Sequence, residues 1–141
     1  MRNFIAVTLV AVFSVLALIH VYWSLAGSGA SKAAVPQVEG RPAFRPSRLA
    51  TLGVALALFA AAALVASAGR VATAWLDLPY ARLLTVLLGL TFLARAVGDF
   101  RLVGFFKRVR GSTFARLDTL VYAPLCLIVG IASLFVGAFD V

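Results

Sequence analysis

Long apolar runs without formal charge are the feature that most constrains the fold of this chain. Residues 4–25, 49–68 and 120–139 contain no Asp, Glu, Lys or Arg, and each has about the 20 residues that a helix needs to cross a membrane. Apolar residues make up 63% of the chain and charged residues 13%, against roughly 45–50% and about 25% in soluble domains. The sequence therefore predicts an integral membrane protein. The first run is longer than the roughly 7–15 residues of the apolar region of a signal peptide, so we expect it to be retained.

A fourth span is predicted with ionisable groups in its last third. The run 83–94 is only 12 residues long, and it reaches membrane length only by continuing through Arg95 and Asp99 to Val103. We therefore expect spans at about 4–25, 49–68, 83–103 and 120–139. Together they predict an all-α four-helix bundle that forms a single transmembrane domain over residues 1–141.

Basic residues are distributed unequally between the two sides of this topology. Three lie on the side of the termini, namely Arg2, Arg70 and Arg82. Nine lie in or beside the two other connections: Lys32, Arg41, Arg45, Arg48, Arg101, Lys107, Arg108, Arg110 and Arg116. Because basic loops stay inside, we expect a multi-pass membrane protein with two cytoplasmic loops and both termini outside. The net charge of +8 lies between apolar runs, so anionic lipid headgroups are the expected partner and nucleic acid is not.

Four ionisable residues are expected in the cytoplasmic third of the bundle: His20, Arg95, Asp99 and Asp118. Charges within a span are costly, which makes them candidates for function. Arg95 and Asp99 are four residues apart and share a helix face, so they form either a structural ion pair or part of a site. Asp118 either stabilises the start of the last helix or joins the site, where Tyr122 could donate to it.

His20 has two interpretations. With Tyr22 and Trp23 it could form an interfacial aromatic belt. It is also the one side chain here whose ordinary pKa suits proton exchange near neutral pH, and a carboxylate converging with it would provide acid and base for a lipophilic substrate.

Other residues support more general conclusions. The run Arg101, Lys107, Arg108 and Arg110 is expected to bind lipid phosphate or another anionic group.

One His, one Cys and one Met cannot supply a structural zinc site or a bis-His haem, so we expect no metal and no cofactor.

Several short motifs resemble a known bacterial family. They are His20-Val21-Tyr22-Trp23, Arg95-Ala96-Val97-Gly98-Asp99-Phe100-Arg101, Gly104-Phe105-Phe106-Lys107-Arg108, Phe114-Ala115-Arg116-Leu117-Asp118 and Tyr122-Ala123-Pro124-Leu125-Cys126. Together they are similar to the small membrane proteins grouped as domain of unknown function 3995. The resemblance implies a short four-span bacterial membrane protein and no particular activity.

Three functions remain open at this point. The first is a small membrane enzyme, isomerase-like or cyclase-like, acting on a lipophilic molecule. His20, Asp99 and Arg95 would be its catalytic residues, and Tyr22, Trp23, Asp118 and Tyr122 would bind substrate. The second is a non-catalytic scaffold, subunit or lipid-binding module, and the third is a small transporter. A cavity that His20 and Asp99 both face would favour the enzyme, whereas a closed and fully paired polar cluster would favour the scaffold.

Overall fold

The computed structural model describes residues 1–27, 29, 32–71 and 77–139. Five α-helices account for most of them: α1 (Arg2–Ala26), α2 (Arg48–Ala68), α3 (Ala81–Val97), α4 (Thr113–Leu117) and α5 (Ala123–Ala138). A π-helical turn, η2 (Asp118–Tyr122), joins α4 to α5, so that one long helix runs over residues 113–138. The expected all-α class is confirmed.

The connection between α1 and α2 covers residues 27–47, and its described part contains only short elements. It holds the 3-10 turn η1 (Lys32–Ala34) and two strands, β1 (Gln37–Val38) and β2 (Arg41–Pro42). The strands pair antiparallel, with Val38 opposite Arg41. The connection between α3 and α4, residues 98–112, contains no helix or strand.

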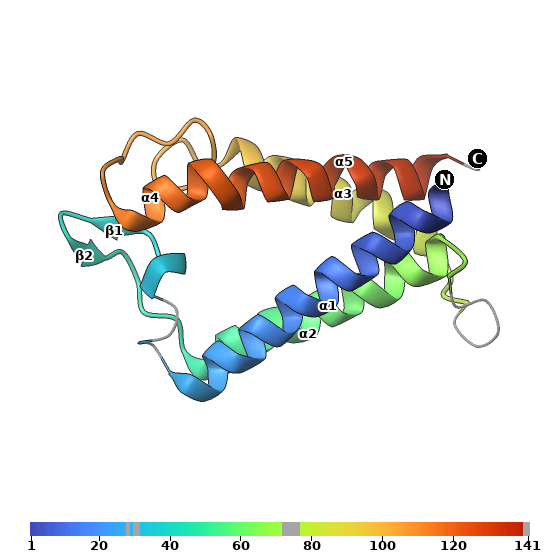
Figure 1. The fold of residues 1–141 in the computed structure, drawn as a ribbon, viewed down its shortest axis with the longest axis horizontal. Helices are drawn as coiled ribbons and strands as arrows, with labels where there is room; N and C mark the ends of the chain where they lie inside the picture. Colours follow the sequence, from blue (N-terminus) through green and yellow to red (C-terminus); the bar gives the residue numbers. More distant parts are fainter. Residues whose placement is uncertain (28, 30–31, 72–76, 140–141) are drawn as a thin grey trace.

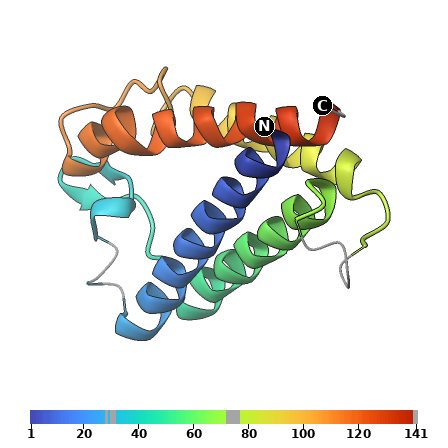
Figure 2. The ribbon, with the colours of Figure 1, turned by 45° about the vertical axis from the view of Figure 1, so that its right-hand side comes forward.

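The helices form two antiparallel pairs, α1 with α2 and α3 with α5, and the largest interfaces lie within these pairs. Figure 1 shows that the pairs meet at the end where both termini lie and diverge toward the opposite end, where residues 32–47 and 98–112 gather. Figure 2 shows the same wedge from another side, with the α1–α2 connection bridging its wide end. The predicted bundle is therefore a wedge whose two halves separate along their length.

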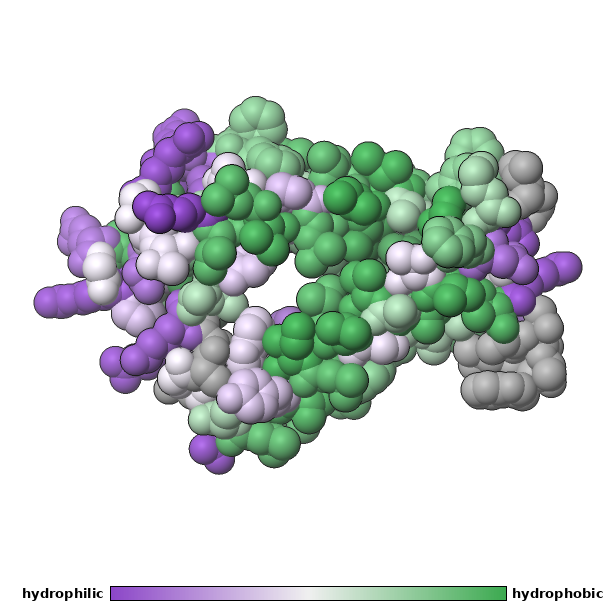
Figure 3. Space-filling view, in the orientation of Figure 1, coloured by the Kyte–Doolittle hydropathy of each residue, from purple (hydrophilic) through white to green (hydrophobic). Residues whose placement is uncertain are grey.

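Within the described ranges, three helical stretches are long and apolar enough to cross a membrane: Arg2–Ala26, Arg48–Ala68 and Thr113–Ala138. On the face drawn in Figure 3, apolar residues form a belt across the middle of the molecule and hydrophilic residues lie at both ends. An apolar surface of this extent is typical of a protein whose solvent is lipid. The helices and this belt indicate a membrane protein.

Two helix boundaries differ from the expected ones. Helix α3 ends at Val97, because Gly98 adopts φ 93° and directs the chain away from the helix axis, so residues 98–103 do not continue it. The last helix begins at Thr113, seven residues earlier than expected, with the Ser112 Oγ accepting a hydrogen bond from the Ala115 amide. The π turn precedes Pro124, whose missing amide removes a regular helical hydrogen bond to Leu120.

Glycines set the distance between α3 and α5. A Cβ added to Gly89 would lie 2.9 Å from the Gly130 carbonyl oxygen. A Cβ added to Gly130 would lie 3.0 Å from the Gly89 carbonyl oxygen. Gly137 makes a similar approach to the carbonyl of Arg82. The two backbones are therefore in direct contact, as small residues allow in membrane helices.

The compact core fills the narrow end of the wedge. Leu9, Phe13, Val65 and Val136 are buried there, together with several alanines of α1 and α2. The Phe13 ring packs on Phe92 of α3, with ring centroids 5.5 Å apart. This contact marks the limit of the filled core, because Phe92 also lines the hollow described next.

Candidate functional site

An apolar cavity separates the two helix pairs on the wide side of the Phe13–Phe92 contact. Its volume is about 340 Å³, and Figure 3 shows the molecule hollowed between the pairs. We call it the wedge cavity. The residues that line it are Leu16, His20, Trp23, Ala34, Val54, Leu58, Phe92, Arg95, Phe114, Tyr122, Leu125, Cys126 and Val129.

The lining residues of each helix recur at helical spacing. On α1 they are Leu16, His20 and Trp23, and on α5 they include Leu125, Cys126 and Val129. Steps of three or four residues place side chains on one face of a helix. The seven helical steps from Leu16 to Trp23 correspond to about 10 Å along the helix axis. The cavity therefore lies along the helices, with mostly apolar walls and polar groups at its wide end.

A second hollow of about 570 Å³ adjoins the wedge cavity and shares His20, Trp23, Ala34 and Val54 with it. Its remaining walls come from residues 44–47 of the α1–α2 connection and from the first turns of α2. This connection also contacts the last helix, since the Tyr122 hydroxyl donates to the Ala33 carbonyl over 3.2 Å. The expectation that Tyr122 donates to Asp118 is thus not met.

His20 contacts Trp23 on the cavity wall. The two rings meet edge to face with centroids 5.0 Å apart, and His20 Nδ1 lies 2.7 Å from the Leu16 carbonyl oxygen. Because a carbonyl only accepts, Nδ1 carries the hydrogen, and in the neutral ring Nε2 is then an acceptor. Among the described residues no hydrogen bond to Nε2 is found. Tyr22 is 62% exposed and lies on another face of α1, apart from this pair.

The predicted Arg95–Asp99 ion pair is wrong. Nη2 of Arg95 donates instead to Oδ1 of Asp118 over 2.8 Å. Asp118 has no exposed surface, and its Oδ2 accepts from Nζ of Lys107 over 3.1 Å and from the Gly104 amide over 2.7 Å. Arg95, Asp118 and Lys107 thus form a cluster of two cations and one anion, in which Asp118 and Lys107 are buried and Arg95 is partly accessible. We call it the ion cluster.

Lys107 belongs to this cluster and not to the surface. It is 3% exposed, and its ammonium group also donates to the Gly104 carbonyl and to the Thr119 hydroxyl. These three partners use all of its donors. The expectation that Lys107 binds lipid phosphate is therefore corrected, whereas Arg101, Arg108 and Arg110 are exposed.

Asp99 has a local structural role. Its Oδ1 accepts the amides of Arg101, Leu102 and Val103 over 2.7 to 3.0 Å, which closes a tight turn after α3. These backbone hydrogen bonds, from Val103 first, lower the pKa of the exposed Asp99 carboxyl below its ordinary value of 3.8. Since Asp99 lies in this turn beyond α3, it does not converge with His20, and the proposed proton exchange between them is not supported.

The same turn delivers groups to the ion cluster. Gly98 and Gly104 pack backbone against backbone, since a Cβ on Gly98 would lie 2.7 Å from the Gly104 Cα. Both have positive φ, of 93° and 85°, which glycine alone adopts without strain. This packing brings the Gly104 amide to Asp118. The motif from Gly98 to Lys107 is thus a structural unit.

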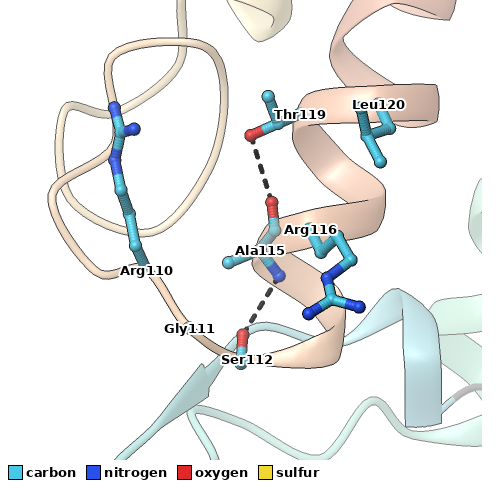
Figure 4. A pocket seen from close by; sticks show the side chains of 7 residues that line it. All are labelled: Arg110, Gly111, Ser112, Ala115, Arg116, Thr119 and Leu120. Carbon is cyan, nitrogen blue, oxygen red and sulfur yellow. Dashed lines mark hydrogen bonds between the residues drawn. The ribbon is translucent and has the colours of Figure 1, made fainter.

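A separate surface hollow of about 300 Å³ lies beside the start of the last helix. Figure 4 shows Arg110 and Arg116 at its walls, with Ser112 capping the helix and Thr119 donating to the Ala115 carbonyl. Two arginines therefore border this hollow. The sequence analysis predicted Arg110 as a ligand of lipid phosphate and did not include Arg116.

Four of the predicted site residues therefore line the wedge cavity: His20, Trp23, Arg95 and Tyr122. Asp118 does not line it but forms an ion pair with Arg95. Cys126, treated from the sequence as a small hydrophobe, lines it as well. No short-range spacing in the sequence indicated that Arg95 and Asp118 would pair, because they are 23 residues apart.

The fold and the site define a small α-helical membrane protein with an apolar cavity between two helix pairs. The chain belongs to the family described as "Protein of unknown function (DUF3995)", whose model matches residues 13–133. No curated protein and no solved structure matches it. The matched range includes the wedge cavity and the ion cluster.

Proposed function

We propose that this protein is a four-span protein of the bacterial inner membrane that binds a lipophilic small molecule in the wedge cavity. The observation that carries the proposal is the cavity itself: about 340 Å³, mostly apolar, and reached by His20, Arg95 and Tyr122. Small-molecule sites are typically about 300–1,000 Å³, with apolar walls and a few polar groups that orient the ligand.

The proposed topology counts α3 as a membrane span in addition to the three long apolar helices. Its 17 residues give a helix of roughly 26 Å, somewhat shorter than the hydrocarbon core of about 30 Å. Arg82 and Arg95 stand near its two ends, and each bonds the neighbouring last helix, Arg82 at the Gly137 carbonyl and Arg95 at Asp118. Nine basic residues at the wide end and three at the narrow end favour a cytoplasmic wide end and extracytoplasmic termini.

Analysis of copurifying molecules tests the proposal. The full chain is extracted in a mild detergent, and its bound molecules are identified by native mass spectrometry. Val54→Trp on α2 places a large side chain in the cavity wall, while Leu56→Trp on the same helix is an exposed control. We expect a bound lipophilic molecule in the wild type and in Leu56→Trp, and much less in Val54→Trp. Equal retention in all three would contradict the proposal.

A catalytic role is the second candidate, and one observation favours it. The Leu16 carbonyl fixes Nδ1 of His20 as the protonated nitrogen, so Nε2 is available to accept a proton from a ligand. Asp99 would have no part in this chemistry. The bound molecules of wild type and His20→Gln distinguish the two roles, because a catalyst would accumulate a different chemical species in the variant. The same species in both would support binding alone.

A further inference from the structure

We infer that the ligand of the wedge cavity is an amphiphile with one apolar chain and an anionic oxygen headgroup, a carboxylate or a phosphate, held by Arg95. This inference rests on the proposed function and adds the chemical class of the ligand. Three features of the described residues support it: the charge of the ion cluster, an unsatisfied guanidinium nitrogen, and the apolar walls that continue from it.

The ion cluster has one positive charge in excess. Arg95 and Lys107 contribute two cations and Asp118 one anion, and both Asp118 oxygens already accept from these cations. The Gly104 amide adds a further donor to Oδ2. Asp118 is therefore saturated, and an uncompensated positive charge remains in a region of low dielectric, where it is costly without an anion.

The unsatisfied donor belongs to Arg95. Its Nη2 bonds Asp118, but its Nη1 is buried and has no hydrogen-bond partner within the described part of the chain. Arg95 lines the wedge cavity, and 33% of its side chain is accessible. Lys107, by contrast, has three partners and almost no accessible surface. Of the two cations, Arg95 is thus the one with accessible surface. Because Nη1 itself is buried, an anion bonds it only when the guanidinium turns toward the cavity, and a planar guanidinium suits carboxylate and phosphate oxygens.

The rest of the ligand must be apolar and slender. From Arg95 the cavity continues along Phe92, Leu58 and Val129 toward the filled core. The wedge cavity itself, about 340 Å³, is at the lower end of the usual range for small-molecule sites, which suits a single apolar chain beyond Arg95. The adjoining hollow of about 570 Å³ lies on the side of residues 44–47. Trp23 and His20 stand on the opposite wall, on α1, where they flank the same space.

Binding of matched amphiphiles tests the inference. The chain has two tryptophans, so the full-length Trp75→Phe protein leaves Trp23 on the cavity wall as the reporter. Bromine-labelled dodecanoate, dodecyl phosphate and dodecanol are titrated at pH 8 in detergent, and quenching of Trp23 gives their affinities. We expect at least one of the two anions to bind roughly tenfold or more tightly than the alcohol, as a charge-assisted hydrogen bond provides.

Two variants locate the preference. Arg95→Gln leaves Asp118 paired with Lys107 and the Gly104 amide, so the fold keeps a neutral ion pair. Arg108→Gln removes an exposed charge at the same end of the molecule. We expect the anion preference to vanish in Arg95→Gln and to persist in Arg108→Gln. Loss in both variants, or in neither, would overturn the assignment to Arg95.

The remaining outcomes separate this inference from the proposed function. If all three amphiphiles bind equally and Val54→Trp abolishes their binding, the cavity binds lipophilic molecules but the anionic headgroup is wrong. If none of them quenches Trp23, both proposals fail. Inorganic phosphate serves as a headgroup without a chain, and we expect it to displace dodecyl phosphate only at far higher concentration. Displacement at similar concentration would overturn the requirement for a chain.

Discussion

Arg95 and Asp118 are 23 residues apart in the chain, yet Nη2 of Arg95 donates a 2.8 Å hydrogen bond to Oδ1 of Asp118. This contact ties the end of α3 to the π turn of the last helix, where the wedge is wide. Lys107 reaches the other Asp118 oxygen from the 98–112 connection. One buried carboxylate therefore holds together α3, the last helix and the 98–112 connection.

Removing the charge of Asp118 should destabilise the protein strongly. In Asp118→Asn two cations lose their anion, and breaking a buried pair in this way costs about 3–5 kcal/mol. The measurement is the free energy of unfolding by denaturant in detergent. Glu39→Gln, at an exposed carboxylate, is the control and should change it by less than about 0.5 kcal/mol. A stability close to wild type for Asp118→Asn would show that the ion cluster is not buried.

The close contact between α3 and α5 should make substitution of its glycines destabilising. A Cβ at Gly130 would lie 2.8 Å from Leu93 Cδ2 and 3.0 Å from the Gly89 carbonyl oxygen, so Gly130→Ala should cost about 1–3 kcal/mol. A Cβ at Gly53 meets nothing within 4 Å, and Gly53→Ala should leave the melting temperature unchanged or raise it. Thermal unfolding of both variants in detergent checks the pair. An equal loss in both would show that α3 and α5 are not in close contact.

The turn after α3 should respond to pH only in acid. The pKa of Asp99 is lowered in the folded state by the amides it accepts, so its contribution is present above the ordinary value of 3.8 and is lost as the pH falls below it. Backbone amide chemical shifts of Arg101, Leu102 and Val103 should titrate together with a midpoint below 3.8. In Asp99→Asn they should not titrate in this range. A midpoint at or above 3.8 would contradict the three hydrogen bonds.

The single cysteine provides a direct probe of cavity occupancy. Cys126 lines the wedge cavity and is partly accessible. Saturating dodecyl phosphate should slow its modification by N-ethylmaleimide several-fold, followed by mass spectrometry of the intact chain. The denatured protein, in which the amphiphile should give no protection, is the control. An unchanged rate in the folded protein would place the amphiphile elsewhere.

Where an uncharged run is long, the sequence predicts the first and last residues of its helix to within a few residues. For α1 and α2 the expected limits of 4–25 and 49–68 compare with Arg2–Ala26 and Arg48–Ala68. The end of α3 was missed because it depends on the backbone of Gly98 and on three amides that converge on Asp99, neither of which hydropathy detects.

Part of the candidate site could also be predicted. His20 and Trp23 are three residues apart on one helix, and their contact follows from that spacing. The partner of Arg95 could not be predicted in this way, because the spacing of four residues favoured Asp99. In the structure Asp99 accepts hydrogen bonds from the backbone of its own turn, and Arg95 pairs with Asp118. The wedge between the helix pairs depends on how four helices pack, which no single run of residues encodes.

The most direct test of the central claim is an experimental structure of the full chain in a lipid nanodisc, at a resolution that shows bound molecules. We predict elongated density within the wedge cavity, beside Phe92 and Val129, that ends at Arg95. A closed wedge, with α2 packed against α5 along its length and no density between the pairs, would contradict ligand binding as the function of this protein.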